Sequence, residues 1–282
     1  MILFKHSEDL KSYLQTIKKR NLTTGFVPTM GALHEGHLSL IKECKKNDNL
    51  TVCSIFVNPV QFNNKEDFNK YPSTIEKDIL LLEENGCDVL FMPSVDEMYP
   101  KGPGITKDFE LGDLENILEG KFRPGHFNGV CLIVEKLLNV VQPGFLYLGQ
   151  KDYQQCLVIK KLIDLMKIET KVLIHPIVRE ANGLAMSSRN LRLSEDEKTL
   201  ASFLYKSLED IKNNILPGNF LKLKNRAIAS LEKKGFKLDY LELADRSDLK
   251  IIEDYTQAQS CILLIAAYLK DVRLIDNLFL KE

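Results

Sequence analysis

The sequence has no long apolar run, no excess of charge of either sign and no closely spaced pair of cysteines. None of its apolar stretches approaches the roughly 20 residues of a membrane-spanning helix, and its first residues lack the apolar core of a signal peptide. We therefore expect a cytoplasmic protein without a membrane partner. With 38 Lys and Arg against 39 Asp and Glu, the net charge is −1, so no overall positive field attracts nucleic acid.

The six cysteines are scattered along the chain without a Cys-x-x-Cys pair, which argues against zinc ligation and disulfide pairing. Most lie in apolar surroundings, so we interpret them as reduced thiols of the core. The rest of the composition, 44% hydrophobic and 27% charged over 282 residues, is that of an ordinary globular protein. It predicts one large or two moderate domains.

Short apolar runs alternate with amphipathic helical patterns along the first 178 residues. This alternation predicts an α/β domain, a Rossmann-like parallel sheet with helices on both faces, over residues 1–178. Because ligands of such sheets bind at the carboxyl ends of the strands, we expect the site in the turns after 30, 57, 148 and 178. The predicted strands are 25–30, 51–57, 88–91, 145–148 and 171–174, and the predicted helices are 37–47, 73–85, 129–140 and 152–167, with Ser73 as N-cap and Gly86 as stop of the second.

The pattern changes after residue 180 and predicts a smaller α+β domain over residues 179–282. Ser194 and Glu197 have the spacing of a capping box, which opens a predicted helix of about twenty residues. A second helix is predicted near 219–234, and short strands are predicted at 238–243, 261–269 and 272–276.

The segment 25–37 carries the strongest functional signal. An apolar strand breaks at Gly31, and a helix restarts near His37, which places His34 and His37 at the amino end of that helix. The first N–H groups and the macrodipole there favour an anion, and Gly31 and Gly36 allow a polyphosphate to approach the backbone. We interpret this segment as a binding site for a nucleotide triphosphate.

The two histidines allow two other interpretations. A zinc-protease helix requires His-Glu-x-x-His, and His34-Glu35-Gly36-His37 is one residue short and contains a glycine. The histidines could also be ordinary surface residues at a helix cap. Polar residues after the later strands favour the phosphate site, because they fall at the same edge of the predicted sheet; they are Asn58 and Gln61, Lys151 and Gln155, and the loop 183–190 with Ser187, Ser188 and Arg189.

Several long motifs in order make the chain similar to the pantoate–β-alanine ligase family of the class I aminoacyl-tRNA synthetase-like nucleotidyltransferases. The motifs are residues 28–37, Phe56-Val57-Asn58-Pro59 with Gln61-Phe62, Arg123-Pro124-Gly125-His126-Phe127, 149–155 and 186–190. The resemblance implies that Mg²⁺-ATP activates pantoate as a pantoyl adenylate, which β-alanine converts to pantothenate. It also implies a homodimer.

The resemblance assigns roles to individual residues. The catalytic side chains are expected to be His34, His37, Lys151 and Arg189, and Mg²⁺ is expected on the ATP phosphates, with no protein ligand assigned to it. Gln61 and Gln155, with Asn58 and His126 as neighbours, are expected to bind pantoate and β-alanine. The expected ATP-binding residues are Met30, Gly31, Ala32, Leu33, His34, Glu35, Gly36, His37, Gly149, Gln150, Lys151, Asp152, Val178, Met186, Ser187, Ser188 and Arg189.

Two rival functions share part of this pattern. A tRNA-binding or tRNA-modifying adenylating protein would need a basic face or an anticodon domain, which the near-zero net charge disfavours. A non-enzymatic nucleotide-binding regulator would need neither substrate amides nor a cation for the leaving group. Because the 183–190 loop follows the domain boundary, we expect the C-terminal domain to close over ATP as a lid.

Overall fold

A computed structural model describes residues 1–104 and 106–280. The chain forms two units, one of Met1–Gly149 with Gln155–Pro176 and the other of Gln150–Gln154 with Ile177–Glu282. The sequence places the boundary between residues 178 and 179. In the structure, the short segment 150–154 also belongs to the second unit, although it lies within the predicted first domain.

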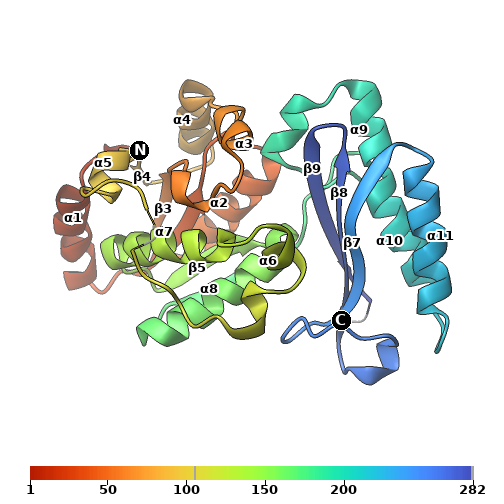
Figure 1. Ribbon diagram of the computed structural model, residues 1–282. Coiled ribbons are helices and arrows are strands. Elements are labelled where there is room, and N and C mark those ends of the chain that lie inside the picture. The colour runs from red at the N-terminus through yellow and green to blue at the C-terminus, as the bar shows by residue number, and fades with distance from the viewer. Residues whose placement is uncertain (105, 281–282) are drawn as a thin grey trace. The chain divides into compact units, whose positions relative to one another are not determined.

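The first unit is built on a six-stranded sheet in the order β1-β4-β3-β2-β5-β6. Figure 1 labels β3, β4 and β5 of this sheet. Neighbouring strands run parallel, with Phe26 opposite Val52 and Leu146. Since β2 lies between β3 and β5, the chain reverses its direction of winding beside β2, which is where such sheets bind ligands. The strands are β1 (Ile2–Phe4), β2 (Thr24–Thr29), β3 (Leu50–Ile55), β4 (Val89–Phe91), β5 (Phe145–Gly149) and β6 (Lys171–His175).

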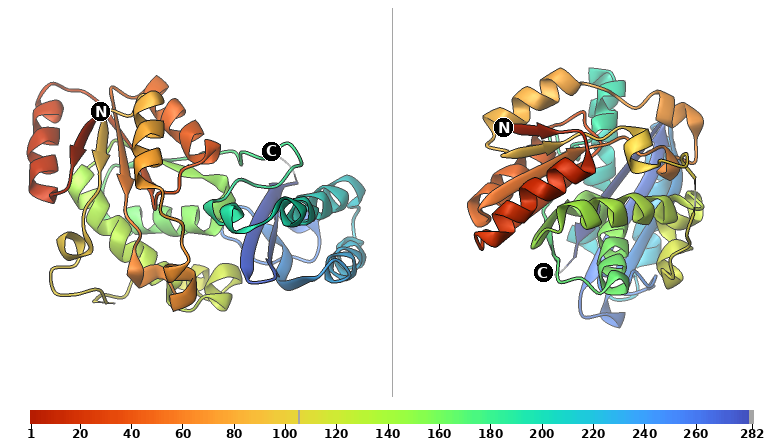
Figure 2. Two further views of the ribbon diagram at one scale, coloured as in Figure 1. Left: turned by 90° about the horizontal axis from the view of Figure 1, so that it is seen from above. Right: turned by 90° about the vertical axis from the view of Figure 1, so that its left-hand side faces the viewer.

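Helices cover both faces of this sheet (Figure 2). Phe26 of β2 packs into a core with α1, α7 and α8, whereas the next residue, Val27, packs into a second core with α2 and α4. Successive strand residues point to opposite faces, so each buried strand serves both cores. The helices are α1 (Ser7–Lys19), α2 (Glu35–Asn47), α3 (Lys65–Asn69), α4 (Ile75–Glu84), α5 (Val95–Met98), α6 (Leu118–Phe122), α7 (His126–Val141) and α8 (Tyr153–Met166), with the 3₁₀ turns η1 (Pro59–Gln61), η2 (Gly112–Glu115) and η3 (Gln150–Asp152).

The second unit contains a three-stranded antiparallel sheet in the order β7-β8-β9. Helices α10 and α11 lie against the sheet, as Figure 1 shows. They share an apolar core with it. The elements are η4 (Ser188–Arg192), α9 (Glu195–Ala201), α10 (Phe203–Asn214), α11 (Phe220–Glu232), β7 (Phe236–Asp245), η5 (Tyr255–Gln257), β8 (Cys261–Leu269) and β9 (Val272–Phe279).

The predicted fold class is confirmed, and three local predictions are wrong. The helix predicted to begin at Ser194 is capped as expected, but it is divided into α9 and α10 at Ser202, whose hydroxyl donates to the Thr199 carbonyl at 2.7 Å. Thr74, not Ser73, is the N-cap of α4. Helix α7 begins at His126 rather than at 129, because the left-handed Gly125 (φ 75°) ends the preceding loop.

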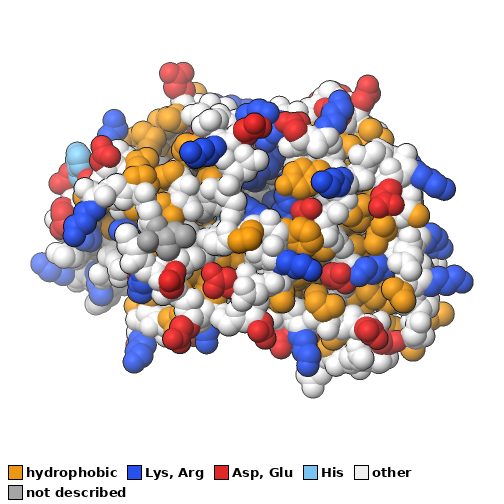
Figure 3. All heavy atoms as spheres, in the orientation of Figure 1, with side chains coloured by type: hydrophobic (Ala, Val, Ile, Leu, Met, Phe, Trp, Pro, Cys, Tyr) orange, Lys and Arg blue, Asp and Glu red, His pale blue; other side chains and the backbone are white. Residues whose placement is uncertain are grey.

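The surface carries charges of both signs. On the face drawn in Figure 3, Lys and Arg side chains are interspersed with Asp and Glu side chains. Among the described residues, no helix has both the length and the apolar character needed to cross a bilayer.

The cysteines give a direct test of the cores. All six are buried and none forms a disulfide, and burial raises the pKa of Cys44, Cys87 and Cys131 to about 12. The thiolate that reacts with alkylating agents is therefore scarce at pH 8. We expect iodoacetamide to leave the six thiols of the native protein unmodified and to label all six in guanidinium chloride. Rapid labelling of the native protein, followed by mass spectrometry, would contradict this arrangement.

Candidate active site

The turn between β2 and α2 adopts backbone conformations that most residues avoid. Gly31 has φ +80° and Ala32 has φ 49°, both in the left-handed region. A Cβ at position 31 would lie 3.1 Å from a carboxylate oxygen of Asp78, so glycine suits both the conformation and the space. The fully buried Asp78 accepts hydrogen bonds of 2.8 Å from the N–H groups of Ala32 and Leu33. Its carboxylate therefore fixes the turn that leads into α2.

His34 and His37 cap the amino end of α2 reciprocally. Nδ1 of His34 accepts a hydrogen bond from the Gly36 N–H at 3.1 Å, and Nδ1 of His37 accepts one from the His34 N–H at 3.4 Å. A neutral imidazole that accepts at Nδ1 carries its proton on Nε2. The two rings, with centroids 4.1 Å apart, therefore present Nε2–H donors at the positive end of the helix macrodipole. Such an arrangement suits an anion.

Asn58 organises the turn that follows β3. It is 1% exposed. Its amide nitrogen donates to Oε1 of Gln61 at 3.1 Å and to the Gly129 carbonyl at 3.0 Å. Its Oδ1 accepts from the Tyr99 hydroxyl at 2.7 Å and from the Val60 N–H at 3.3 Å. Burial raises the pKa of Tyr99 to about 12, so the hydroxyl stays a donor. These contacts use both donors and both acceptor positions of the Asn58 amide.

The amino end of α7 packs against the same turn. Nε2 of His126 accepts from Nη1 of Arg123 at 3.0 Å, since a guanidinium can only donate. Nδ1–H of His126 then donates to the Gln61 carbonyl at 2.8 Å. Gly129 allows the helix to approach closely, because a Cβ there would lie 2.6 Å from the Val60 carbonyl oxygen. Helix α7 therefore sets the position of Gln61.

Both glutamines of the predicted acyl subsite lie near the carboxyl end of the central strands. The amide nitrogen of Gln61 donates to Sδ of Met30 at 3.2 Å, just beyond β2. Gln155 is half-buried in the first turn of α8, which follows β5, and β5 pairs with β2. A cavity of about 340 Å³ opens at this edge of the sheet, and Met30 and Gly31 belong to its lining.

The second unit holds the other predicted ATP contacts on a short turn and a hairpin. Lys151 lies in η3, with its ammonium group 3.3 Å from Oδ2 of Asp152. The segment 178–186 folds back on itself, and the Met186 N–H donates to the Val178 carbonyl at 3.0 Å. The hairpin thus places Met186, at the start of the 186–189 segment, next to Val178.

The residues after the hairpin are held by hydrogen bonds of their own. Oγ of Ser187 accepts from the Arg189 N–H at 3.2 Å and caps η4. The Asn190 amide nitrogen donates to Oε1 of Glu180 at 2.9 Å and to the Ala185 carbonyl at 3.1 Å. The loop that carries Ser187 and Arg189 is therefore fastened to the hairpin.

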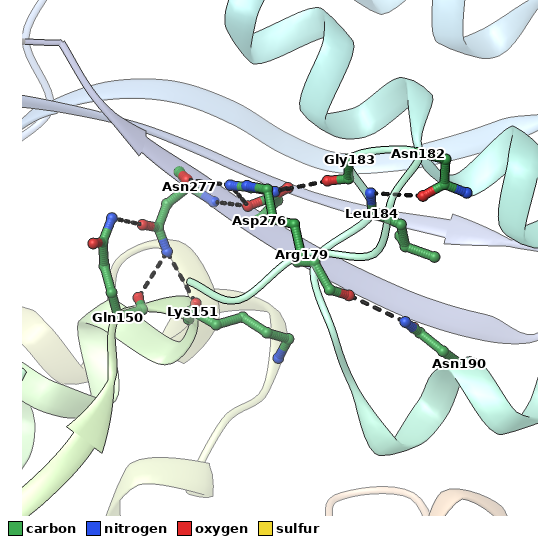
Figure 4. A network of polar contacts seen from close by, with 10 residues as sticks. Gln150, Lys151, Arg179, Asn182, Gly183, Leu184, Asn190, Asp276 and Asn277 are labelled. Carbon is green, nitrogen blue, oxygen red and sulfur yellow. Dashed lines mark hydrogen bonds and ion pairs between the residues drawn. The ribbon is translucent and has the colours of Figure 1, made fainter. Parts of the chain in front are cut away.

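A buried polar network connects both segments to β9 (Figure 4). Arg179 forms a bidentate ion pair with Asp276, with N–O distances of 2.7 and 3.0 Å. The Asn277 amide nitrogen donates to the carbonyl oxygens of Gln150 at 2.9 Å and Lys151 at 3.0 Å. Burial raises the pKa of Asp276, and the guanidinium of Arg179 acts in the opposite direction.

The structure thus gathers the predicted residues into one set in each unit. Residues 30–37 with Asn58, Gln61, His126 and Gln155 lie in the first unit, and residues 150–152 with 178–189 lie in the second. Gly149 ends β5, and Ser188 is buried in η4. Arg123 lies in one of the motifs, but sequence reasoning assigned it no role. The other residues that hold these sets in place were missed, since most of them occupy ordinary helix or strand positions; they are Asp78, Tyr99, Gly129, Arg179, Asp276 and Asn277.

Comparison with known proteins gives one consistent result. The family model described as Pantoate-beta-alanine ligase matches residues 2–279. The pantothenate synthetase of Cytophaga hutchinsonii is 45% identical over 281 residues, with 99% of each chain covered. The solved pantothenate synthetase of Thermus thermophilus superposes with a TM-score of 0.91 at 36% identity and 100% coverage of both chains.

A second solved structure shows what a similar protein binds. The Francisella tularensis pantoate-beta-alanine ligase, complexed with beta-gamma ATP and beta-alanine, has 38% identity, a TM-score of 0.84 and coverage of 99% and 98%. Family model, relatives and solved structures agree over nearly the whole length of the chain. The chain therefore belongs to the pantoate-beta-alanine ligase family of enzymes.

Proposed function

We propose that this protein joins pantoate and β-alanine into pantothenate through a pantoyl adenylate, with release of AMP and pyrophosphate from ATP. The observation that carries the proposal is the reciprocal cap of α2. Two imidazole Nε2–H donors and a helix amino end meet there, just beyond a central strand of a parallel sheet. The names of the relatives supply the acyl and amine substrates.

The first step is an in-line displacement at phosphorus. A carboxylate oxygen of pantoate bonds to the α-phosphorus of ATP, while the bond from that phosphorus to the bridging oxygen breaks and pyrophosphate leaves. Because the carboxylate is already ionised at neutral pH, the step needs no protein base and no covalent nucleophile. The protein has to align the reactants and stabilise the charge that develops on the phosphate oxygens.

Four side chains are proposed to stabilise that charge. His34 and His37 supply Nε2–H donors from the first unit, and Lys151 and Arg189 supply cations from the second. The backbone and side chains of 30–37, 149–152, Val178 and 186–189 are proposed to complete the ATP contacts.

We propose that magnesium enters on the ATP phosphates. Within residues 1–104 and 106–280, no group of three or more His, Cys, Asp or Glu side chains is placed to hold a metal ion. The carboxylates around the β2–α2 turn are engaged elsewhere, since Asp78 accepts from two backbone N–H groups and Glu35 pairs with Lys42 at 3.4 Å. Phosphate-bound Mg²⁺ would neutralise part of the negative charge.

The acyl subsite is proposed to use neutral amides. A bidentate arginine would draw the charge of the pantoate carboxylate into strong hydrogen bonds and weaken it as a nucleophile. Gln61 and Gln155 offer directional donors without a positive charge. Asn58 and His126 have hydrogen bonds that are directed at the Gln61 turn. We therefore propose that these two residues position Gln61.

Gln61→Ala and Gln155→Ala are each expected to raise the KM for pantoate or to lower kcat by about tenfold to a hundredfold, because the amides orient only the acyl substrate. ATP affinity, measured by calorimetry, should stay close to that of the wild type. The exposed Gln15 of α1 provides a matched control, and Gln15→Ala should change neither quantity. Loss of ATP binding with unaltered pantoate kinetics would place these glutamines in another subsite.

In the second step, the neutral amine of β-alanine attacks the acyl carbonyl and AMP leaves. The amine needs only to be deprotonated and positioned. The adenylate must be kept from water until then, so we propose that the second unit acts as a lid. ATP is expected to slow amide hydrogen exchange across residues 183–190. An active enzyme whose exchange there is the same with and without ATP would contradict the lid.

We also propose a cytoplasmic homodimer. The dimer follows from the family resemblance, and six buried thiols that form no disulfide suit a reducing compartment. Light scattering should give twice the chain mass of 32.2 kDa, and a mass of one chain would contradict the dimer.

The products of turnover test the proposed reaction. With pantoate, β-alanine and ATP, we expect pantothenate, AMP and pyrophosphate in equal amounts. Formation of ADP and phosphate would instead indicate an acyl phosphate, and a requirement for RNA would indicate a tRNA enzyme.

A further inference from the structure

Strand β9 contains two consecutive buried polar residues, Asp276 and Asn277, and the alternation of the strand predicts an apolar residue at position 276. Val272, Leu274 and Leu278 face the apolar core of the second unit, and Asp276 occupies the same face between them. Asp276 is 4% exposed and Asn277 is 2% exposed. Since a buried ion pair is often no more stabilising than apolar residues of similar volume, fold stability alone is a weak reason for a carboxylate at this position.

On the core face, Asp276 holds the hairpin. Its carboxylate binds both terminal nitrogens of Arg179, and Nη1 of Arg179 also donates to the Gly183 carbonyl at 3.1 Å. The guanidinium lies over the Tyr205 ring, with its carbon 3.6 Å from the ring centroid. Arg179 therefore has little freedom, and the base and the tip of the hairpin are fixed together.

On the opposite face, Asn277 holds the turn that carries Lys151. Its amide nitrogen donates to the Gln150 and Lys151 carbonyls, and its Oδ1 accepts from the Gln150 amide at 3.0 Å. Figure 4 shows the two neighbouring residues of β9 reaching these two separate segments. Both segments belong to the second unit, although about 25 residues of chain separate Lys151 from Val178, and most of those residues belong to the first unit.

We propose that Asp276 and Asn277 are positioning residues that hold the Lys151 turn and the 178–190 hairpin as one ATP-binding element of the second unit. This inference rests on the proposed function of Lys151 and Arg189. It adds that the lysine moves with the second unit, whereas the sequence assigns it to the first. The two cations then reach the triphosphate together, at a distance from each other that β9 sets.

The proposal is tested with Asn277→Leu and Asn277→Asp, which remove the donor to the two carbonyls, and with the double change Arg179→Met and Asp276→Leu, which leaves no unpaired charge. A matched control is the change Arg273→Met with Asp239→Leu. That ion pair, at 2.7 Å, also links β9 to another element of the second unit, since Asp239 lies in β7.

Pantoate-dependent ATP–pyrophosphate exchange is the first measurement. We expect kcat/KM for ATP to fall about tenfold to a hundredfold in the Asn277 variants and in the Arg179/Asp276 double variant. The KM for pantoate should change less than about twofold, as should both constants in the Arg273/Asp239 control. A merely structural role would impair the kinetics with ATP and with pantoate alike, or would affect the Arg273/Asp239 control equally. Either result would overturn the proposal.

Amide hydrogen exchange without ATP is the second measurement, and it does not depend on activity. We expect faster exchange in both 150–154 and 183–190 in the test variants, including any variant too unstable for kinetics at the assay temperature, and wild-type exchange in the control. Unchanged exchange, or wild-type ATP kinetics in Asn277→Leu, would overturn the inference. Failure of the wild-type chain to release pyrophosphate would instead overturn the proposed function.

Discussion

His37→Ala is expected to slow pantoyl adenylate formation by about two to three orders of magnitude, the usual effect of losing an electrostatic donor to the transition state. His34→Ala should have a similar effect, because both rings present Nε2–H at the amino end of α2. Pantoate-dependent ATP–pyrophosphate exchange measures this step directly. Wild-type exchange rates in both variants would contradict the phosphate-site interpretation.

Variants that preserve the cap separate chemistry from helix stability. His34→Ser keeps an N-cap acceptor, and His37→Glu keeps the acceptor of the capping box, but neither supplies an imidazole donor. We expect both to melt close to the wild type, whereas the alanine variants lose about 0.5–2 kcal/mol. All four should be slow. His6, which is exposed and pairs with Glu97 at 3.1 Å, is the matched control, and His6→Ala should react at the wild-type rate.

Asp78→Ala is expected to be the most destabilising of the changes considered. It would remove the hydrogen bonds that Asp78 accepts from the buried Ala32 and Leu33 N–H groups, at about 1–3 kcal/mol each. The same change should release the turn that carries both histidines, so adenylate formation should fall by about a hundredfold or more where the variant still folds. Chemical denaturation and pyrophosphate exchange measure the two effects.

Asp78→Asn and Asp88→Asn test whether the loss of activity is specific to the β2–α2 turn that Asp78 fixes. Asparagine at position 78 keeps one acceptor oxygen but turns an NH₂ group toward a backbone N–H, so an intermediate loss of stability and activity is expected. Asp88 makes a similar 2.8 Å contact with the Thr51 N–H at the other end of the sheet. Asp88→Asn should therefore leave activity unchanged. Equal loss of activity in the two asparagine variants would show that Asp78 has no particular role in the turn.

The sequence was sufficient for the fold class because short apolar strands alternate with helices that have a clear apolar face, such as β2 with α2 and β5 with α8. It missed β1 because this strand has only three residues, of which Ile2 and Leu3 are exposed, so no buried run marks it. It also missed α1, although Leu10, Leu14 and Ile17 are buried at helical spacing. It treated α9 and α10 as one helix, since the one residue between them, Ser202, keeps helical dihedral angles (φ −62°, ψ −18°).

The candidate site was less predictable because much of it depends on contacts between distant residues. The helix-end position of His34 and His37 could be predicted from the break at Gly31. The acceptor for the Ala32 and Leu33 N–H groups could not, because Asp78 lies 45 or more residues away in an ordinary helix. The pair 276–277 left a weak signal, namely two polar residues inside an apolar strand, but nothing local indicates that they hold Lys151 and the hairpin.

The central claim is that pantoate is activated as an adenylate that stays bound until β-alanine arrives. The most direct test mixes the protein with ATP and pantoate and omits β-alanine. About one pyrophosphate should be released per active site, and pantoyl adenylate should remain with the protein through rapid gel filtration, because the intermediate is held away from water. Later addition of β-alanine should convert it to pantothenate and AMP. Stoichiometric ADP, or no pyrophosphate release in the presence of pantoate, would contradict the account.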